Sequence, residues 1–155
     1  MLSEKELLVN LLSPKGDRFD TSNTSPYVSM KNHDKLTVVV AHQGGTTGKS
    51  TLQLKAASDS SGTGAAAIAF SYRRKTTGAS STWGAISAAT SAGIDTVPGE
   101  DTLIELFVNS AGLPDGKPYV ALVTTEAVND PVNGSAIAIL SDARFAGTSH
   151  PAVLS

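Results

Sequence analysis

Short apolar runs, separated by turns rich in Gly, Ser, Thr and Asn, follow one another along the chain from Tyr27 to Ala146. Some runs are continuous and β-branched, whereas others alternate polar and apolar residues with the period of two that is typical of a half-buried strand. The predicted strands are residues 36–42, 51–56, 67–73, 81–86, 102–108, 119–124 and 136–140. Short strands divided by regular turns predict an all-β, antiparallel domain of the sandwich or jelly-roll type.

The start of the chain has a helical pattern instead. Ser3 and Glu6 have the spacing of a capping box, and Pro14 and Gly16 mark the end of the segment. The leucines that would share one helical face are Leu7, Leu8, Leu11 and Leu12. So short a helix is marginal in water, and we therefore expect its leucine face to dock either on its own domain or on a neighbouring subunit.

A polar stretch links this predicted helix to the strands. It contains one large apolar residue, Phe19, which is a candidate peg into a pocket of a partner. The predicted organisation is therefore a helix and extended arm in residues 1–25, followed by one β domain in residues 26–155.

Composition narrows the function classes. The length of 155 residues suits a single domain with a modest core, and charged residues make up 17%, below the roughly 25% of a typical domain. A net charge of −2 predicts no general attraction to nucleic acid or to a membrane surface. The chain has no cysteine, which excludes disulfides, thiolate nucleophiles and Cys-ligated zinc, and favours assembly in a reducing cytoplasm. Residues 1–12 do not resemble a signal peptide, and no apolar run approaches the roughly 18 residues of a membrane span.

One segment resembles a nucleotide-binding loop. The predicted strand 36–42 leads into Gly44-Gly45-Thr46-Thr47-Gly48-Lys49-Ser50-Thr51, in which Gly-Lys-Ser-Thr is the end of a phosphate loop. The first glycine of that motif is replaced by Gln43, and the following segment reads as a strand rather than as the helix that would hold the phosphate. We therefore expect a hairpin loop between two antiparallel strands.

Other chemical candidates are weak. His33, His42 and His150 have no metal-ligand spacing, so no metal, cofactor or catalytic residue is predicted. Glu100, Asp101 and Glu105 read as a solvated turn and strand rather than as a paired-carboxylate site. Trp83 is expected in the core or at a subunit interface. An alternative is a glycan- or host-surface-binding module on a fibre, spike or tail component, with Trp83, Tyr72 and Arg73 lining a patch.

Two stretches carry a family resemblance. Residues 27–40, Tyr-Val-Ser-Met-Lys-Asn-His-Asp-Lys-Leu-Thr-Val-Val-Val, resemble the opening of a family of small tailed-bacteriophage head proteins, and residues 51–65 and 67–72 are similar in order. The family ends with an apolar strand that runs into Leu-Ser-x-x-Arg-aromatic-Ala, and residues 140–146, Leu-Ser-Asp-Ala-Arg-Phe-Ala, match that pattern. The similarity covers about two-thirds of the chain from Tyr27 onward, is weakest over residues 76–100, and excludes the predicted helix.

The resemblance implies a head decoration, or cement, protein. Such proteins are non-enzymatic, bind the outside of the major capsid shell and reinforce the expanded head. The implied partners are the major capsid protein and further copies of the chain, with a trimer favoured over a dimer. The implied location is the virion surface, after synthesis in the host bacterial cytoplasm. The predicted contact residues are Leu7, Leu8, Leu11, Leu12 and Phe19, with Arg144 and Phe145 as either local closure or interface.

Overall fold

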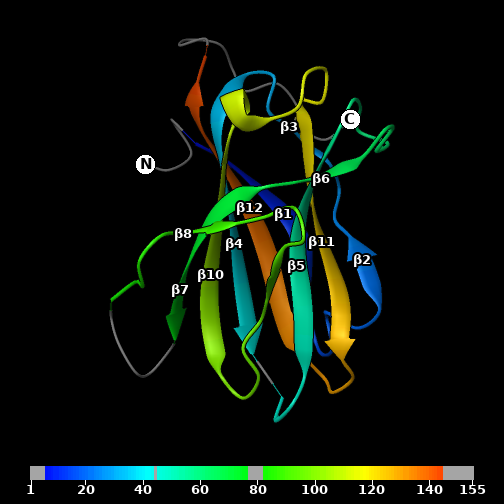
Figure 1. Ribbon diagram of the computed structural model, residues 1–155, viewed down its shortest axis with the longest axis vertical. Helices are drawn as coiled ribbons and strands as arrows, with labels where there is room; N and C mark the ends of the chain where they lie inside the picture. Colours follow the sequence, from blue (N-terminus) through cyan, green and yellow to red (C-terminus); the bar gives the residue numbers. More distant parts are fainter. Residues whose placement is uncertain (1–5, 44, 77–81, 145–155) are drawn as a thin grey trace.

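The protein is a sandwich of two antiparallel sheets, as the sequence predicts. The computed structural model describes residues 6–43, 45–76 and 82–144, and Figure 1 shows the two sheets facing each other. Sheet A has the order β1 (Leu7–Lys15), β12 (Asn133–Ala143), β4 (His33–Gln43), β10 (Asp101–Asn109), β7 (Phe70–Thr76), β8 (Ser87–Ala89). Sheet B has the order β2 (Ser22–Thr24), β11 (Tyr119–Val128), β5 (Lys49–Ala57), β6 (Ala66–Ile68), with β3 (Val28–Ser29) also on β11 and β9 (Ile94–Asp95) also on β5. A single 3-10 turn, η1 (Ser110–Gly112), follows β10.

The strand pairing is nested. β1 pairs with β12, β2 and β3 pair with β11, β4 pairs with β10, and β5 pairs with β6 and β9, all antiparallel. The first part of the chain therefore folds back on the last part, which is the strand order of jelly rolls. β7 and β8 extend sheet A beyond that plan.

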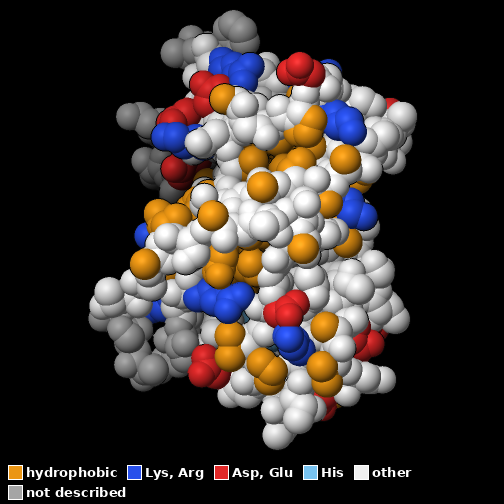
Figure 2. Space-filling model, in the orientation of Figure 1, with side chains coloured by type: hydrophobic (Ala, Val, Ile, Leu, Met, Phe, Trp, Pro, Cys, Tyr) orange, Lys and Arg blue, Asp and Glu red, His pale blue; other side chains and the backbone are white. Residues whose placement is uncertain are grey.

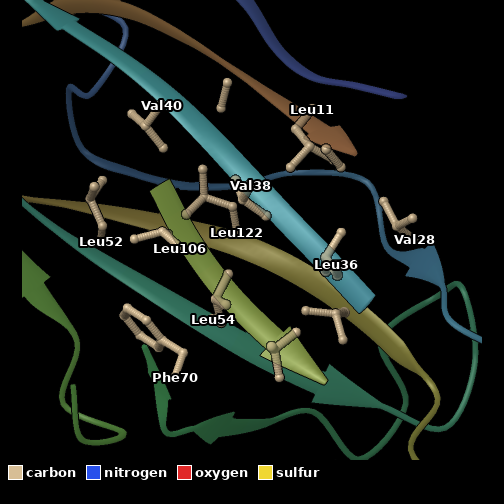
Figure 3. Close-up of a cluster of buried hydrophobic side chains, with 14 of the residues drawn as sticks. Leu11, Val28, Leu36, Val38, Val40, Leu52, Leu54, Phe70, Leu106 and Leu122 are labelled. Carbon is tan, nitrogen blue, oxygen red and sulfur yellow. The ribbon is translucent and has the colours of Figure 1, made fainter. Parts of the chain in front are cut away.

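The core lies between the sheets and follows from the alternation in the strands. Val38 from β4 and Leu106 from β10 point toward Leu54 from β5 and Leu122 from β11 (Figure 3), and all four side chains are at most 1% exposed. Because successive side chains in a strand point to opposite faces, every second residue of β4, β5 and β10 enters this layer. The predicted strands at 36–42, 51–56, 102–108, 119–124 and 136–140 are confirmed, and the run 67–73 divides into β6 and β7.

The predicted N-terminal helix is wrong, because residues 7–15 form strand β1. Leu7 to Asn10 pair in regular register with Leu140 to Ile137 of β12, and an irregularity follows between Asn10 and Leu12. This irregularity allows the consecutive Leu11 and Leu12 both to be buried, which mimics helical spacing in the sequence. The open edge of β12 supplies hydrogen-bond partners that a short isolated helix lacks. Ser3 of the predicted capping box lies outside the described residues.

The predicted extended arm is also part of the sandwich. Phe19 is 1% exposed and its ring lies 6.2 Å from that of His42, so its pocket is in its own domain. The backbone N–H of Arg18 donates to the Val132 carbonyl at 2.8 Å, and β2 then pairs with β11. Residues 7–24 therefore supply two strands of the same fold.

Two further predictions on local structure are corrected. The loop after Gln43 is not a hairpin, because β4 belongs to sheet A and β5 to sheet B, so it crosses between the sheets. The predicted strand 81–86 is not formed over residues 82–86, and β8 begins only at Ser87. Short runs of small residues carry too little packing information to locate such an edge strand.

Candidate functional site

The phosphate-loop candidate is held by carboxylates of the chain itself. Oδ2 of Asp130 accepts hydrogen bonds from the N–H groups of Thr47 at 2.9 Å and of Gly48 at 3.1 Å. Nζ of Lys49 lies 2.7 Å from Oδ2 of Asp95. These are the N–H and ammonium groups that a phosphate would need, and β5 follows directly in place of a helix. The loop therefore crosses from sheet A to sheet B and is held in place by hydrogen bonds to Asp130 and by the ion pair between Lys49 and Asp95.

We expect the replacement Asp130→Asn to lower the melting temperature at pH 7, since a neutral amide oxygen accepts hydrogen bonds more weakly than a carboxylate. The N–H of Thr47 holds the pKa of Asp130 below its ordinary value of 3.8. A depressed carboxyl pKa adds stability above 3.8, and that stability is lost as the pH falls through the lower folded-state pKa. The difference in melting temperature from the unmodified protein, followed by circular dichroism, should therefore shrink below about pH 4.

The matched control for this prediction is Asp115→Asn, in the exposed turn before β11. We expect it to leave the melting temperature unchanged. Equal effects of both replacements at pH 7 would show that Asp130 does not hold the loop.

Among the described candidates, His42 lies at the acidic turn, where it hydrogen-bonds the backbone of Glu100 and feels the charge of Asp101. His33 and His42 are both buried, at opposite ends of β4, and burial lowers the pKa of His42. His150 lies outside the described residues. Asp101 and Glu105 are four residues apart on β10, so their backbone positions are about 13 Å apart along the strand. This distance exceeds the separation between the two carboxyl groups of a glycoside hydrolase site. Within the described residues, no group of three or more His, Cys, Asp or Glu could hold a metal ion.

The three residues of the glycan-binding alternative do not share one face of the sheet, because Tyr72 and Arg73 are consecutive in β7 and point to opposite sides. Arg73 lies on the outer face of β7, where its guanidinium carbon is 4.6 Å from the centroid of the Trp83 ring and 5.6 Å from that of Phe107. Tyr72 points the other way and packs against the core. Trp83 is half-buried under Arg73 rather than in the core. The structure thus brings two of the three patch residues together.

The predicted contact residues also separate into two groups. Leu11, Leu12 and Phe19 lie in the core of their own domain, and Leu7 packs against it. Leu8 is 48% exposed on the outside of sheet A.

At the end of β12, Arg144 closes the fold locally. Its N–H donates to the Asn32 carbonyl at 2.9 Å, and its Nε donates to Oδ1 of Asp34 at 2.7 Å, with much of the side chain still exposed. Phe145 lies outside the described residues. The local-closure reading of Arg144 therefore has a structural basis, and the interface reading stays a prediction.

The most unusual surface is one that the sequence reading did not identify. Register and alternation place six large apolar side chains on the outside of sheet A, across β1, β12, β4 and β10, with Thr37 between Ile139 and Phe107. We call this surface the sheet A face. Its large apolar members are Leu8, Val39, Leu103, Phe107, Ile137 and Ile139.

These members form rows across the strands. Ile139 lies opposite Leu8 on one side and Thr37 on the other, and Val39 lies opposite Ile137 and Glu105. Ile137 is 37% exposed, and the more central members are half-buried by their neighbours. An antiparallel sheet that meets water usually has a polar outer face, so this apolar face indicates a contact surface.

Sheet B provides an internal comparison. The outward residues of β5 are Lys49, Thr51, Gln53 and Lys55, and Thr125 faces outward beside Thr51 on β11. This is the polar pattern expected for a solvated face. The polar pattern is confined to β5 and the end of β11, because Val123 and Ala121 face the same side opposite Gln53 and Lys55 and are only 4% and 1% exposed.

The sheet A face also carries charged side chains of both signs, including Lys75 opposite Leu103 and Asp101 at the start of β10. Nε of Arg73 lies 2.5 Å from Oε2 of Glu105, directly across the β7–β10 pair. At one end, Lys35 pairs with Asp142 at 2.6 Å. Figure 2, in the orientation of Figure 1, shows side chains of opposite charge next to each other in its lower part and hydrophobic side chains through its middle.

The other end of the sheet A face is hollowed. A cleft of about 600 Å³ lies over Ala41, Leu103 and Ser135, with Pro14 and Lys15 of β1 on its side. Its floor is low because Ala41 and Ser135, which lie opposite each other on this face, have small side chains. The face is therefore concave at this end.

A sequence signal for this face existed. Val38-Val39-Val40 and Ala136-Ile137-Ala138-Ile139-Leu140 are continuously apolar, which is the pattern of strands buried on both faces. In sheet B, β5 alternates instead, whereas β11 carries a similar continuous run over residues 119–123.

Comparison of the chain with protein-family models, with curated proteins and with solved structures finds no match. Among the described residues, no helix is long and apolar enough to cross a membrane.

Proposed function

We propose that this protein is a non-enzymatic structural protein of a tailed-phage virion, which binds the outer surface of the major capsid shell and stabilises the expanded head. The observation that carries this proposal is the sheet A face. A surface with six large apolar side chains and an internally neutralised ion pair suits protein contact. Polar side chains gather instead at one end of the face, around the cleft lined by Lys15, Gln43 and Asn133.

The family resemblance supports the proposal through the segments that carry it. The opening run, residues 27–40, enters β4, and the closing run, residues 140–146, begins in β12. β4 and β12 are neighbours in sheet A, where Leu36 lies opposite Leu140. The two most similar segments are therefore neighbours in the sheet, and the first contributes Val39 to the sheet A face, opposite Ile137.

The proposed mechanism is bridging. Each copy covers apolar surface at the junction of neighbouring subunits, so rupture of the shell must also break the added contacts. Individual contacts of modest strength suffice when copies are linked, because linkage raises the effective concentration of the second contact. The polar outward side chains of β5 suit exposure to solvent.

The experiment is co-sedimentation with heads of the cognate phage, both expanded and unexpanded. We expect saturable binding to expanded heads by the unmodified protein and by the control Thr125→Lys on sheet B. Ile137→Lys on the sheet A face should bind at least 10-fold more weakly, because a lysine placed in an apolar contact must be desolvated. Absence of binding by the unmodified protein to either head form would contradict the proposal.

A further inference from the structure

We infer that residues 16–21, which we call the strap, open from the domain when His42 takes up a proton. This inference concerns the fold itself and does not rest on the proposed function. The strap connects β1 to β2 and covers one end of the core with the ring of Phe19, which is 1% exposed. Proton uptake at His42 therefore releases a defined segment while the long strands of both sheets stay paired.

The strap is held by few backbone contacts, and its own backbone is strained. The N–H of Arg18 donates to the Val132 carbonyl at 2.8 Å. The Thr21 carbonyl accepts a hydrogen bond from the N–H of Glu126 at 2.9 Å. Asp17 and Thr21 have φ angles of 50° and 51°, a region that residues other than glycine rarely adopt, least of all a β-branched residue. Strain near both ends of a weakly held segment favours local opening.

The Phe19 ring is the main apolar attachment of the strap, and it packs against His42. The centroids of the two rings lie 6.2 Å apart, and His42 is 3% exposed. A Cβ atom on Gly134 would come within 2.5 Å of the Phe19 ring, so the ring lies directly on bare backbone. The closed strap thus shields the imidazole from water, and opening of the strap hydrates it.

The surroundings of His42 favour the neutral imidazole while the strap is closed. Burial has the largest influence and lowers the pKa of His42 from its ordinary value of 6.5, and the charge of Arg74 acts in the same direction. The backbone of Glu100 and the charge of Asp101 raise the pKa but do not cancel this shift. Nδ1 of His42 lies 3.3 Å from the hydroxyl of Thr102, which is a neutral partner. The closed state therefore disfavours the imidazolium.

The strap does not supply the countercharge of His42. Its charged side chains are those of Asp17, Arg18 and Asp20. Among the described residues, the charges that shift the pKa of His42 are those of Asp101 on β10 and Arg74 on β7. The partners on β12 and β5 are uncharged, since Gly134 lies opposite His42 and the Ser50 hydroxyl binds the Phe19 carbonyl. Opening of the strap therefore brings water to the imidazole without removing a negative charge from it.

Acidification below pH 6.5 favours the open strap. Between the ordinary pKa of 6.5 and the lower pKa of the closed state, the open state binds one proton that the closed state does not. The opening equilibrium therefore rises by about 10-fold for each pH unit below 6.5, until the pKa of the closed state is reached. The carboxyl of Asp130 titrates below its ordinary value of 3.8, so its own effect on the fold falls in a more acidic range.

The test is hydrogen–deuterium exchange of the full chain at pH 7, 6 and 5, followed by mass spectrometry and corrected for the intrinsic pH dependence of amide exchange. We expect exchange in residues 16–25 to speed up by about 10-fold for each pH unit below 6.5, down to the pKa of the closed state, while β4 and β10 stay protected. His42→Gln should abolish this pH dependence, because the amide does not titrate.

His33→Gln is the matched control, since His33 is a buried histidine at the opposite end of β4. We expect this variant to keep the pH dependence in residues 16–25. Three results would overturn the inference: exchange in residues 16–25 that does not depend on pH, the same dependence in His42→Gln, or an equal acceleration in β4 and β10.

A second measurement covers the case in which His42→Gln fails to fold. The imidazole of His42 is titrated by NMR in the unmodified protein, where its signals are identified by their proximity to the Phe19 ring. We expect its pKa to lie below 6.5 and the contact signals between the two rings to vanish as the imidazole becomes protonated. A pKa at or above 6.5, or a ring contact that persists in the protonated state, would overturn the inference as well.

Discussion

Replacing Phe19 with alanine should destabilise the protein by about 3–5 kcal/mol, the range for removal of a buried phenylalanine side chain. Phe19 is 1% exposed and its ring packs beside that of His42. Its backbone is tied into the same region, because its carbonyl accepts a hydrogen bond from the Ser50 hydroxyl at 3.3 Å. The residue thus joins the segment before β2 to the start of both β5 and β12. Urea unfolding followed by circular dichroism measures the loss.

Leu8→Ala is the matched control, since both residues precede Tyr27 and both were predicted to contact a partner. Leu8 is 48% exposed, so its truncation should cost less than about 1 kcal/mol. Should Phe19→Ala prove as mild as Leu8→Ala, residues 16–21 would not be part of the cooperative fold.

A chain that begins at Tyr27 should fail to form the native sandwich. It lacks β1 and β2 and loses the core residues Val9, Leu11, Leu12 and Phe19. The missing burial amounts to roughly 1.5–3 kcal/mol for each large side chain, which together is comparable to the whole stability of a domain. β12 would also become an open apolar edge, which promotes aggregation. We expect no cooperative thermal transition and loss of soluble protein at micromolar concentration.

Addition of a synthetic peptide with residues 6–25 is the control for this truncation. The peptide carries both missing strands and should restore a cooperative transition, because it can pair with β12 and β11. A truncated chain that melts cooperatively at the temperature of the full protein, without the peptide, would show that residues before Tyr27 are dispensable. Head-binding experiments need point variants rather than this truncation, since a chain that does not fold would fail to bind even if residues 1–26 made no contact with the head.

The N-terminal segment shows why one element was predicted wrongly. Leucines at positions 7, 8, 11 and 12 satisfy helical spacing, and local propensity alone favours that reading. A strand with an irregularity after Asn10 satisfies the same positions, because it buries Leu11 and Leu12 on consecutive residues. The choice depends on the unpaired edge of β12, which lies more than a hundred residues away in the chain. Tertiary pairing therefore overrode local pattern here.

The candidate surface was predictable in part. The strands at residues 38–40 and 136–140 carry apolar side chains on both faces, which indicates that both faces are buried. The pattern does not say whether the outer face is covered by another layer of the same chain or by a partner. The contact residues predicted before Tyr27 were chosen because they had no place in the predicted sheet. Most of them turned out to complete the core, and Leu8 joined the sheet A face because β1 pairs with β12.

The sequence by itself determined the all-β class, the positions of the long central strands and the side chains that each strand turns to one face, because alternation is a local property of a few neighbouring residues. Only the tertiary structure decided that residues 7–24 are strands of the sandwich, that the glycine loop crosses between sheets under Asp130, and that Leu8, Val39, Phe107 and Ile137 share one outer face. These depend on the order and register of strands that are distant in the chain. Register is set by pairing between strands, which no single segment specifies.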